Sequence, residues 1–247
     1  MRPFAIRILI VLLTIACLEY IIYQGWINPL LLPPPSEIFS SIIQLMLTKK
    51  LWWNLWVTTS EVLVASVISI PLGIIAGLLL AKHVLFGKLF GPFVYFLVSV
   101  PKSIFLPLFI LMIGVDFDQK VIFGIFQAFF VIAINTAAAT ATVPQAWVIL
   151  GRSCGANTYQ LYTKIYVPSM LPMVLEGVRL GVIFIITGVI LAEMYAARAG
   201  LGFIITNWAD TFNMPYLLAG ITIAAVLSIF INESIRWYEK KVSFWRG

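Results

Sequence analysis

Long apolar runs alternate with short polar segments along the whole chain. Six of these runs reach the length of about 20 residues that a helix needs to cross a bilayer. They cover residues 5–23, 56–80, 93–113, 121–143, 173–194 and 216–235. No polar block of domain size separates them, so we expect a single transmembrane domain over residues 1–247. The predicted fold is an all-α integral membrane protein with six transmembrane helices.

Prolines and small residues modify this pattern inside the spans. Pro71, Pro101 and Pro107 remove backbone donors and should bend their helices. The second span has a small residue at every fourth position, and the fifth repeats this pattern with Gly177 and Gly181. The positions in the second span are Ala65, Ser69, Gly73, Gly77 and Ala81. Such stripes let helices approach closely, which indicates either tight packing or a role in gating.

The connection between the first two spans has its own signals. Three prolines at 33–35 exclude a helix, and Ser36 is suited to cap a new one. Apolar residues recur at helical spacing from Ile38 to Leu47. This pattern predicts an amphipathic helix along the outer membrane face. Interfacial anchors are expected where the next span begins, at Trp52, Trp53 and Trp56.

Composition and charge support a multi-pass membrane protein. Hydrophobic residues make up 62% of the chain and charged residues 11%, whereas soluble domains are about a quarter charged. Basic residues favour the cytoplasmic side, which here holds Arg2, Arg7, Lys82, Lys88, Arg152, Lys164, Arg236, Lys240, Lys241 and Arg246. The other side holds Lys49, Lys50, Lys120 and Arg198. We therefore expect both termini in the cytoplasm, an uncleaved first helix and no nucleic-acid partner.

The sequence shows few groups that carry chemistry. Nucleophile-elbow and metal-binding spacings are missing, and the single histidine, His83, falls in a predicted loop. The ionisable residues within the spans form no chain that would relay protons; they are Glu61, Lys102, Glu176, Arg179 and Glu193. We expect no catalytic residue and no metal site. Energy for any transport should come from another protein.

A polar insert at residues 144–172 separates the fourth and fifth spans, and its second part reads "GANTYQLYTKIYVPSMLP". Gly155 should break a helix, and Pro168 should end the next element. We expect two short helical pieces across the cytoplasmic membrane face, with apolar side chains directed at a docking partner. The amphipathic turn between Gly155 and Pro168 contains Tyr159, Leu161 and Tyr162.

The spacing in this insert resembles the "EAA" loop of bacterial ATP-binding-cassette (ABC) importer permeases. That loop has Gly, nine residues and Ile-x-Leu-Pro; here Gly155 precedes Ile165, and Val167 replaces Leu. Further resemblance lies in "LLPPPSEIF", "VPKSIFLPLFILMIG", "NTAAAT", "EGVRLG" and "LAEMYAARAGLGFII". The resemblance is greatest to the permeases for taurine, aliphatic sulfonates, nitrate and thiamine-pyrimidine precursors. The resemblance implies the type I ABC importer (MetI-like) fold with a cytoplasmic coupling helix.

The resemblance also implies a function and partners. A homodimer, or a pair of related permeases, would enclose one path through the bacterial inner membrane and its lipids. Two cytoplasmic ATPase subunits would bind ATP and Mg, while this chain would bind no cofactor. A periplasmic or lipid-anchored binding protein would deliver a small polar solute. The implied ATPase-coupling residues are Gly151, Gly155, Tyr159, Leu161, Tyr162, Ile165 and Pro168, and the implied path or gate residues are Glu61, Asn135, Glu193, Gly200 and Gly202.

Two departures from the family pattern bear on this function. The letters that name the EAA motif would fall at Ile149, Leu150 and Gly151, so its acid is absent. Glu61 stands where these relatives commonly have arginine. It either faces the path, where it would disfavour an anion, or pairs with Lys102 or another base, or faces the outer interface.

The other path residues have alternatives as well. Glu193 either lines the path or is a hydrated acid at a helix end. Asn135 bonds either a neighbouring helix or the solute. Gly200 and Gly202 allow either a tight turn or a hinged loop.

Three other functions stay open from the sequence. A secondary transporter or channel would move solute without any ATPase. An intramembrane enzyme would need a nucleophile with a base within reach, which the ionisable residues do not supply. A purely structural subunit would lose little when the insert is changed.

Overall fold

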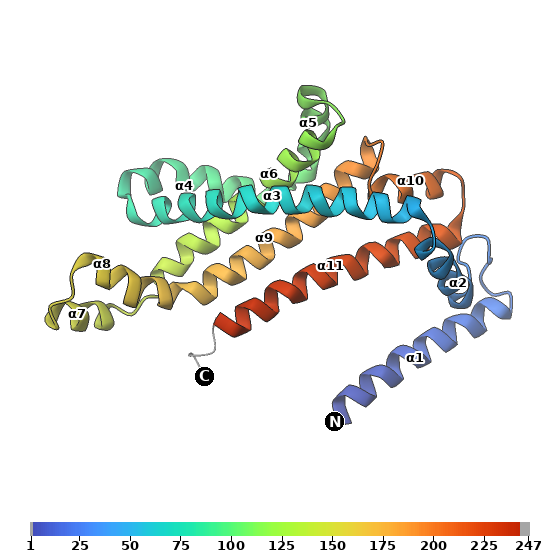
Figure 1. The fold of residues 1–247 in the computed structure, drawn as a ribbon, viewed down its shortest axis with the longest axis horizontal. Helices are drawn as coiled ribbons and strands as arrows, with labels where there is room; N and C mark the ends of the chain where they lie inside the picture. Colours follow the sequence, from blue (N-terminus) through green and yellow to red (C-terminus); the bar gives the residue numbers. More distant parts are fainter. Residues whose placement is uncertain (1, 243–247) are drawn as a thin grey trace. The chain divides into compact units, whose positions relative to one another are not determined.

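The described chain consists of helices and short connections, without any β-strand among residues 2–242 (Figure 1). The computed structural model describes the backbone of that range and its side chains except at 2–5, 8, 238, 240 and 242. The all-α prediction is confirmed. Arg246 and the side chains of Arg2 and Lys240, which entered the prediction of orientation, lie outside what is described.

The described residues form two compact units, one of residues 2–57 and 199–227 and the other of residues 58–198 and 228–242. We call them unit 1 and unit 2. That they act together as one permease domain stays a prediction.

Unit 1 contains three complete helices and the first parts of two long ones. They are α1 (Arg2–Tyr23), α2 (Pro35–Met46), α10 (Leu201–Asp210), and the beginnings of α3 (Lys49–Lys82) and α11 (Met214–Val242). The amphipathic helix predicted after the prolines is confirmed as α2. Its predicted cap is wrong, because the N-cap residue is Pro34, and Ser36 instead donates its hydroxyl to Glu19 Oε1 at 2.6 Å.

Unit 2 contains the remaining elements. They are the rest of α3 and α11, α4 (Val84–Ser99), the 3₁₀ turn η1 (Lys102–Phe105), α5 (Leu106–Ile113), α6 (Phe117–Ala141), α7 (Gln145–Ser153), α8 (Thr158–Leu161), the π-helical turn η2 (Tyr162–Tyr166) and α9 (Val167–Tyr195). The α6 and α9 helices lie side by side along much of their length (Figure 1).

Four described helices are long and apolar enough to cross a membrane. They are Lys49–Lys82, Phe117–Ala141, Thr158–Tyr195 and Met214–Trp237. They cover the second, fourth, fifth and sixth predicted apolar runs, and that they cross a membrane at these bounds stays a prediction. The apolar stretch described in α1, Leu9–Tyr23, is shorter, so the first span stays a prediction.

The third predicted span is wrong as a single helix over residues 93–113. An apolar helix already begins at Val84, and the chain turns by 93° between Ser99 and Lys102. Pro101 causes the break because it cannot donate a backbone hydrogen bond and holds the residue before it in an extended conformation. Val100 is indeed extended, with ψ 136°. Pro107 lies in the first turn of α5, where a missing donor is tolerated.

The central packing feature of unit 2 is the contact of α6 with α3 and α9 through glycines. A Cβ atom on Gly73 of α3 would lie 2.7 Å from Ile132 Cβ, and one on Gly77 would collide with the carbonyl oxygen of Ala133. From α9, Gly181 faces the opposite flank of Ile132, where a Cβ would lie 2.5 Å from its Cγ1. Ile132 is fully buried between them. The predicted small-residue stripes therefore bring helices together within one chain.

We expect Gly77→Ala to destabilise unit 2 by about 1–3 kcal/mol, because the new methyl group meets backbone that cannot rotate away. Thermal unfolding of the detergent-solubilised protein measures the effect. Gly91→Ala in α4 is the matched control, since a Cβ there meets no atom within 4 Å. Equal melting temperatures for the two variants would contradict the proposed packing role.

Candidate functional site

The insert of residues 144–172 folds into two helical pieces that are joined by a turn, at one end of unit 2. Its first piece, α7, ends where Gly155 adopts φ +79°, a left-handed conformation that favours glycine. The amide of Gly155 donates to Arg152 O at 2.9 Å, and that of Ala156 donates to Gly151 O at 2.9 Å. These bonds satisfy the last carbonyl groups of the helix and reverse the chain. The predicted helix break at Gly155 is confirmed.

The second piece, α8, begins with a capping box. Asn157 accepts a hydrogen bond from the Gln160 amide at 2.9 Å, and the Gln160 side chain accepts one from the Asn157 amide at 2.9 Å. Both bonds satisfy amides that the first turn would otherwise leave free. A helix of one turn is unstable alone, so this cap fixes where the second piece starts.

Close contact joins α7 to the second piece. A Cβ on Gly151 would lie 2.7 Å from Ile165 Cδ1 and 2.9 Å from Leu161 Cδ2. Leu161 is buried, and Val148 of α7 is buried as well. Gly151, Leu161 and Ile165 thus hold the two pieces together, as a buried apolar contact within the insert. The structure brings these three predicted coupling residues into one cluster.

The prediction that Pro168 ends the second piece is wrong. Helix continues from Thr158 to Tyr195, and Pro168 lies in the first turn of α9. The π-helical turn η2 precedes it, and the Val167 amide donates to Tyr162 O, five residues back. This wider turn changes the hydrogen-bond register just before the proline, so the helix passes the missing donor. The insert is therefore directly continuous with a membrane-spanning helix.

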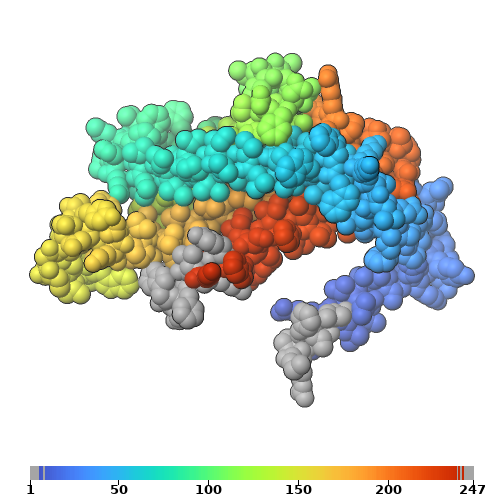
Figure 2. Space-filling model, in the orientation of Figure 1, coloured from blue at the N-terminus to red at the C-terminus, as the bar shows by residue number. Residues whose placement is uncertain are grey.

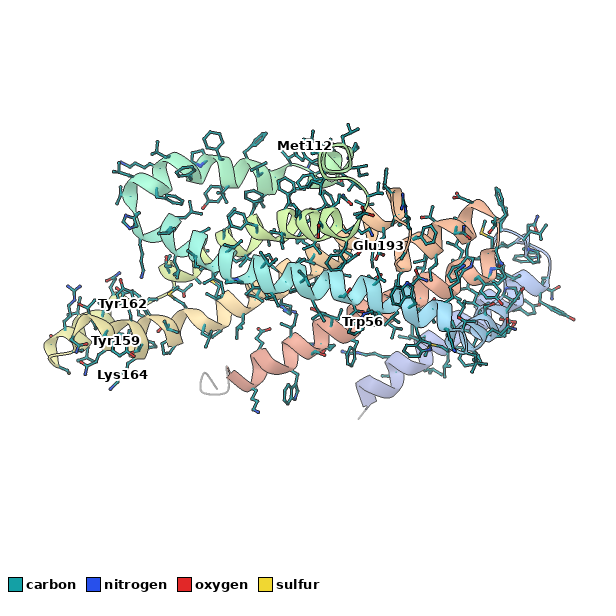
Figure 3. The ribbon with its side chains drawn as sticks, turned by 45° about the horizontal axis from the view of Figure 1, so that its top comes forward. Trp56, Met112, Tyr159, Tyr162, Lys164 and Glu193 are labelled. Atoms are coloured by element: carbon teal, nitrogen blue, oxygen red, sulfur yellow. The ribbon has the colours of Figure 1, made fainter. Side chains whose placement is uncertain are left out.

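Two tyrosines of the second piece, Tyr159 and Tyr162, have exposed side chains (Figure 3). Tyr159 is 75% exposed and makes no ring contact among the described residues. The Tyr162 ring lies 5.2 Å from that of Tyr166, and Lys82 Nζ of α3 lies 3.9 Å from the centre of the Tyr162 ring. The insert thus contacts α3 through a cation–π pair as well as α9 through the backbone.

A buried polar cluster lies toward the opposite end of α9, away from the labelled tyrosines in Figure 3. Lys120 Nζ pairs with Glu61 Oε1 at 3.1 Å, and both side chains are at most 5% exposed. Thr58 donates its hydroxyl to Glu193 Oε1 at 2.6 Å, and Glu193 also contacts Glu61. The cluster links α3, α6 and α9. Of the alternatives for Glu61, pairing with a base is the one observed.

Lys120 is a site residue that the sequence analysis missed, because it was assigned to an outer loop. It lies in the first turn of α6 and is buried. An acid such as Glu61 within an apolar run needs a buried base, and this requirement was the available signal. The named candidate, Lys102, instead lies 5.2 Å from the Phe184 ring centre.

The other predicted path residues have surroundings of their own. Asn135 donates its side-chain amide to Val131 O of its own helix at 2.8 Å, and its Cβ covers Gly177. In unit 1, the Gly200 amide donates to Asn54 Oδ1 at 2.7 Å, with φ +117° at the start of α10. Gly202 is buried in the first turn of that helix. Their roles in a path or gate stay predictions.

An apolar helical chain with several candidate spans and a helical insert is typical of a multi-pass membrane protein. Comparison with protein families makes the assignment specific. The chain belongs to the family of binding-protein-dependent transport system inner membrane components, whose model matches residues 69–244. That range includes α6, α9 and the whole insert.

Individual relatives extend the similarity over most of the chain. The taurine transport system permease protein TauC of Escherichia coli (strain K12) is 24% identical over 226 residues, which cover 90% of this chain and 82% of that protein. The formylaminopyrimidine transport permease protein ThiX of Halalkalibacterium halodurans is 28% identical, covering 89% of this chain and 87% of its own length. The chain is an ABC importer permease subunit of this family.

Solved structures show the same fold. A chain of the MetNI methionine ABC transporter in an inward-facing conformation matches with a TM-score of 0.61 and 17% identity, covering 78% of this chain and 94% of that chain. A chain of an amino acid ABC transporter with histidines matches with a TM-score of 0.61 and 15% identity, over 83% and 96% of the two chains. The predicted MetI-like fold is confirmed.

We expect Lys120→Met to destabilise unit 2 by about 3–5 kcal/mol, because it leaves the Glu61 carboxylate buried without its partner. The double variant Glu61→Met/Lys120→Met should recover most of this loss, since no unpaired charge remains. Thermal unfolding in detergent measures both. Arg236→Gln, which breaks the exposed Arg236–Glu233 pair, is the control and should change little. A double variant less stable than the single would contradict this account.

Proposed function

We propose that this chain forms the translocation path of an ATP-driven importer and is moved by an ATPase that docks on residues 144–172. The insert is the observation that carries the proposal. It projects at one end of unit 2, in yellow in Figure 2, and its second piece runs as one helix into α9. Force applied to α8 would therefore reach a membrane-spanning helix without crossing a flexible loop.

The packing of unit 2 supports transmission beyond α9. The glycines of α9 contact α6, and α6 in turn contacts the glycines of α3. Lys82 adds a separate contact between the end of α3 and Tyr162 of the insert. Close-packed helices move together because their interfaces do not deform continuously. A push on the insert would thus shift three helices together.

The proposal includes the partners and the orientation. The insert and both termini lie in the cytoplasm, and two copies of the chain, or this chain and a related permease, enclose the path. Two ATPase subunits bind ATP and Mg below them, and this chain contributes no catalytic residue. A periplasmic or lipid-anchored binding protein delivers the solute. The family of binding-protein-dependent transport systems supports a binding protein, and the chain of the MetNI methionine ABC transporter supports an ATP-driven assembly.

The proposed solute is small and polar, such as a sulfonate, taurine, nitrate or a pyrimidine. The relatives support this class through the taurine and formylaminopyrimidine in their names. Glu61 does not argue strongly against an anionic solute, because its carboxylate is buried and paired with Lys120. An acid neutralised in this way does not present a free negative charge to a path.

Photocrosslinking tests the docking partner directly. With benzoylphenylalanine at Tyr159, ultraviolet illumination of native membranes should give an adduct with an ABC ATPase, identified by mass spectrometry. The same label at Phe93 of α4, which is 67% exposed, is the control and should not. An insert that never crosslinks to an ATPase, or that is labelled only from outside the cell, would overturn the proposal.

Gly155→Val should lower uptake while membrane insertion stays normal. Valine is disfavoured at φ +79° by about 1–2 kcal/mol, so α7 and α8 would change their relative direction. Gly25→Val is the matched control, because Gly25 has φ +75° and, like Gly155, would place a Cβ in open space.

Uptake is measured in proteoliposomes that hold the assembled complex, with a cargo found beforehand by a ligand screen on the binding protein. Transport should require the ATPase and ATP. Transport by the chain alone would instead support a secondary transporter or channel. Equal uptake by the Gly155 and Gly25 variants would remove the assigned role of Gly155.

A further inference from the structure

The charge of the insert is of one sign. Residues 144–172 contain no aspartate or glutamate and two basic residues, Arg152 and Lys164. Both are exposed, and neither forms an ion pair with any residue that the structure describes. The surface offered to a docking partner is therefore positively charged, with no acid to attract a basic partner.

The same surface has exposed apolar side chains around these charges. Trp147 is 50% exposed, Ile149 65% and Leu150 63%, all on α7. Tyr159 of α8 extends the apolar surface beyond Gly155. Together they leave a patch that water does not favour, as is typical of a protein–protein contact.

Each basic residue lines a separate hollow of the insert. Lys164 lies with Trp147, Leu150, Ile165 and Pro168 around a groove of about 330 Å³. Arg152 lies with Gly155, Asn157, Tyr162 and other residues around a second hollow of about 510 Å³. Both hollows lie wholly within unit 2. A partner side chain would meet Lys164 in a mainly apolar groove and Arg152 in a hollow that is largely polar.

We infer that the insert binds an acidic, apolar-floored groove on its ATPase, with one carboxylate at Arg152 and another at Lys164. This inference rests on the proposed function and specifies the chemistry of the partner. The apolar side chains would supply most of the affinity, and the two charge pairs would set the orientation and speed association. A basic groove would meet like charges at both hollows and is excluded by them.

The experiment uses the full chain in complex with the ATPase that co-purifies with it. Arg152→Glu and Lys164→Glu should each weaken ATPase binding by about tenfold at low salt. Lys88→Glu is the matched control, because Lys88 is exposed on α4 outside the insert, and it should not change binding. The affinity of the unchanged chain should fall with salt, and that of the double variant should depend on salt much less.

Charge exchange on the partner completes the test. Carboxylates of the ATPase that crosslink next to position 152 or 164 are changed to lysine, and each change should restore binding of the matching glutamate variant. Charge-reversed variants that bind as well as the unchanged chain would overturn the inference but leave the proposed function standing. Failure of any ATPase to co-purify would overturn both.

Lipid composition separates the protein partner from an anionic membrane surface. Binding is measured in vesicles of phosphatidylcholine alone and in vesicles that also contain phosphatidylglycerol. The loss caused by Arg152→Glu should be the same in both. A loss that occurs only with phosphatidylglycerol would assign the two cations to lipid headgroups and overturn the inference.

Discussion

The packing of unit 2 depends on α6, which contacts α3 and α9 where glycines of those two helices allow a close approach. Ile132 and its neighbours on α6 occupy space that any side chain at Gly73, Gly77 or Gly181 would fill. In a bilayer there is little hydrophobic force between helices, so such close packing supplies much of their association. The buried Glu61–Lys120 pair adds a polar contact between α3 and α6. Together these contacts let the three helices transmit displacement as a packed group.

The way in which the insert is joined to α9 lets it act on these three helices. A loop between α8 and α9 would absorb motion, whereas the observed helix is continuous through η2 and Pro168. The capping box at Asn157 fixes where α8 begins, and the left-handed Gly155 reverses the chain between α7 and α8. The helix therefore runs without a break from the start of α8 to Tyr195.

Much of this architecture was predictable from residue patterns, because a bilayer imposes length and polarity rules that single residues rarely override. Four long apolar helices, the α2 helix and the break at Gly155 follow from such patterns. The coupling role of Gly151, Leu161 and Ile165 was implied only by the family resemblance and stays a prediction. Predictions from single residues failed where the structure of a neighbouring segment decided whether a helix ends. Pro168 is a helix terminator only if the preceding hydrogen-bond register is α-helical, and η2 changes that register.

The remaining errors have similar causes. Pro101 predicted a bend, but the angle of 93° depends on how α5 packs, which the sequence does not state. Leu106 of that helix packs with Phe123 and Ala192 in a separate core cluster. Lys120 was assigned to solvent because charges beside an apolar run are usually hydrated, and its burial depended on an acid 59 positions away. Pairings at such separation require a tertiary structure or an explicit search for unmatched charges.

The η2 turn has a further consequence for the direction of the insert. Each residue of an α-helix advances the chain by about 100° around its axis. A turn closed five residues back instead of four accommodates one additional residue. Deleting a single residue there would rotate α7 and α8 about the α9 axis by roughly that angle and break the contact of Tyr162 with Lys82 of α3. A single residue in this turn thus sets the direction in which α7 and α8 project from α9.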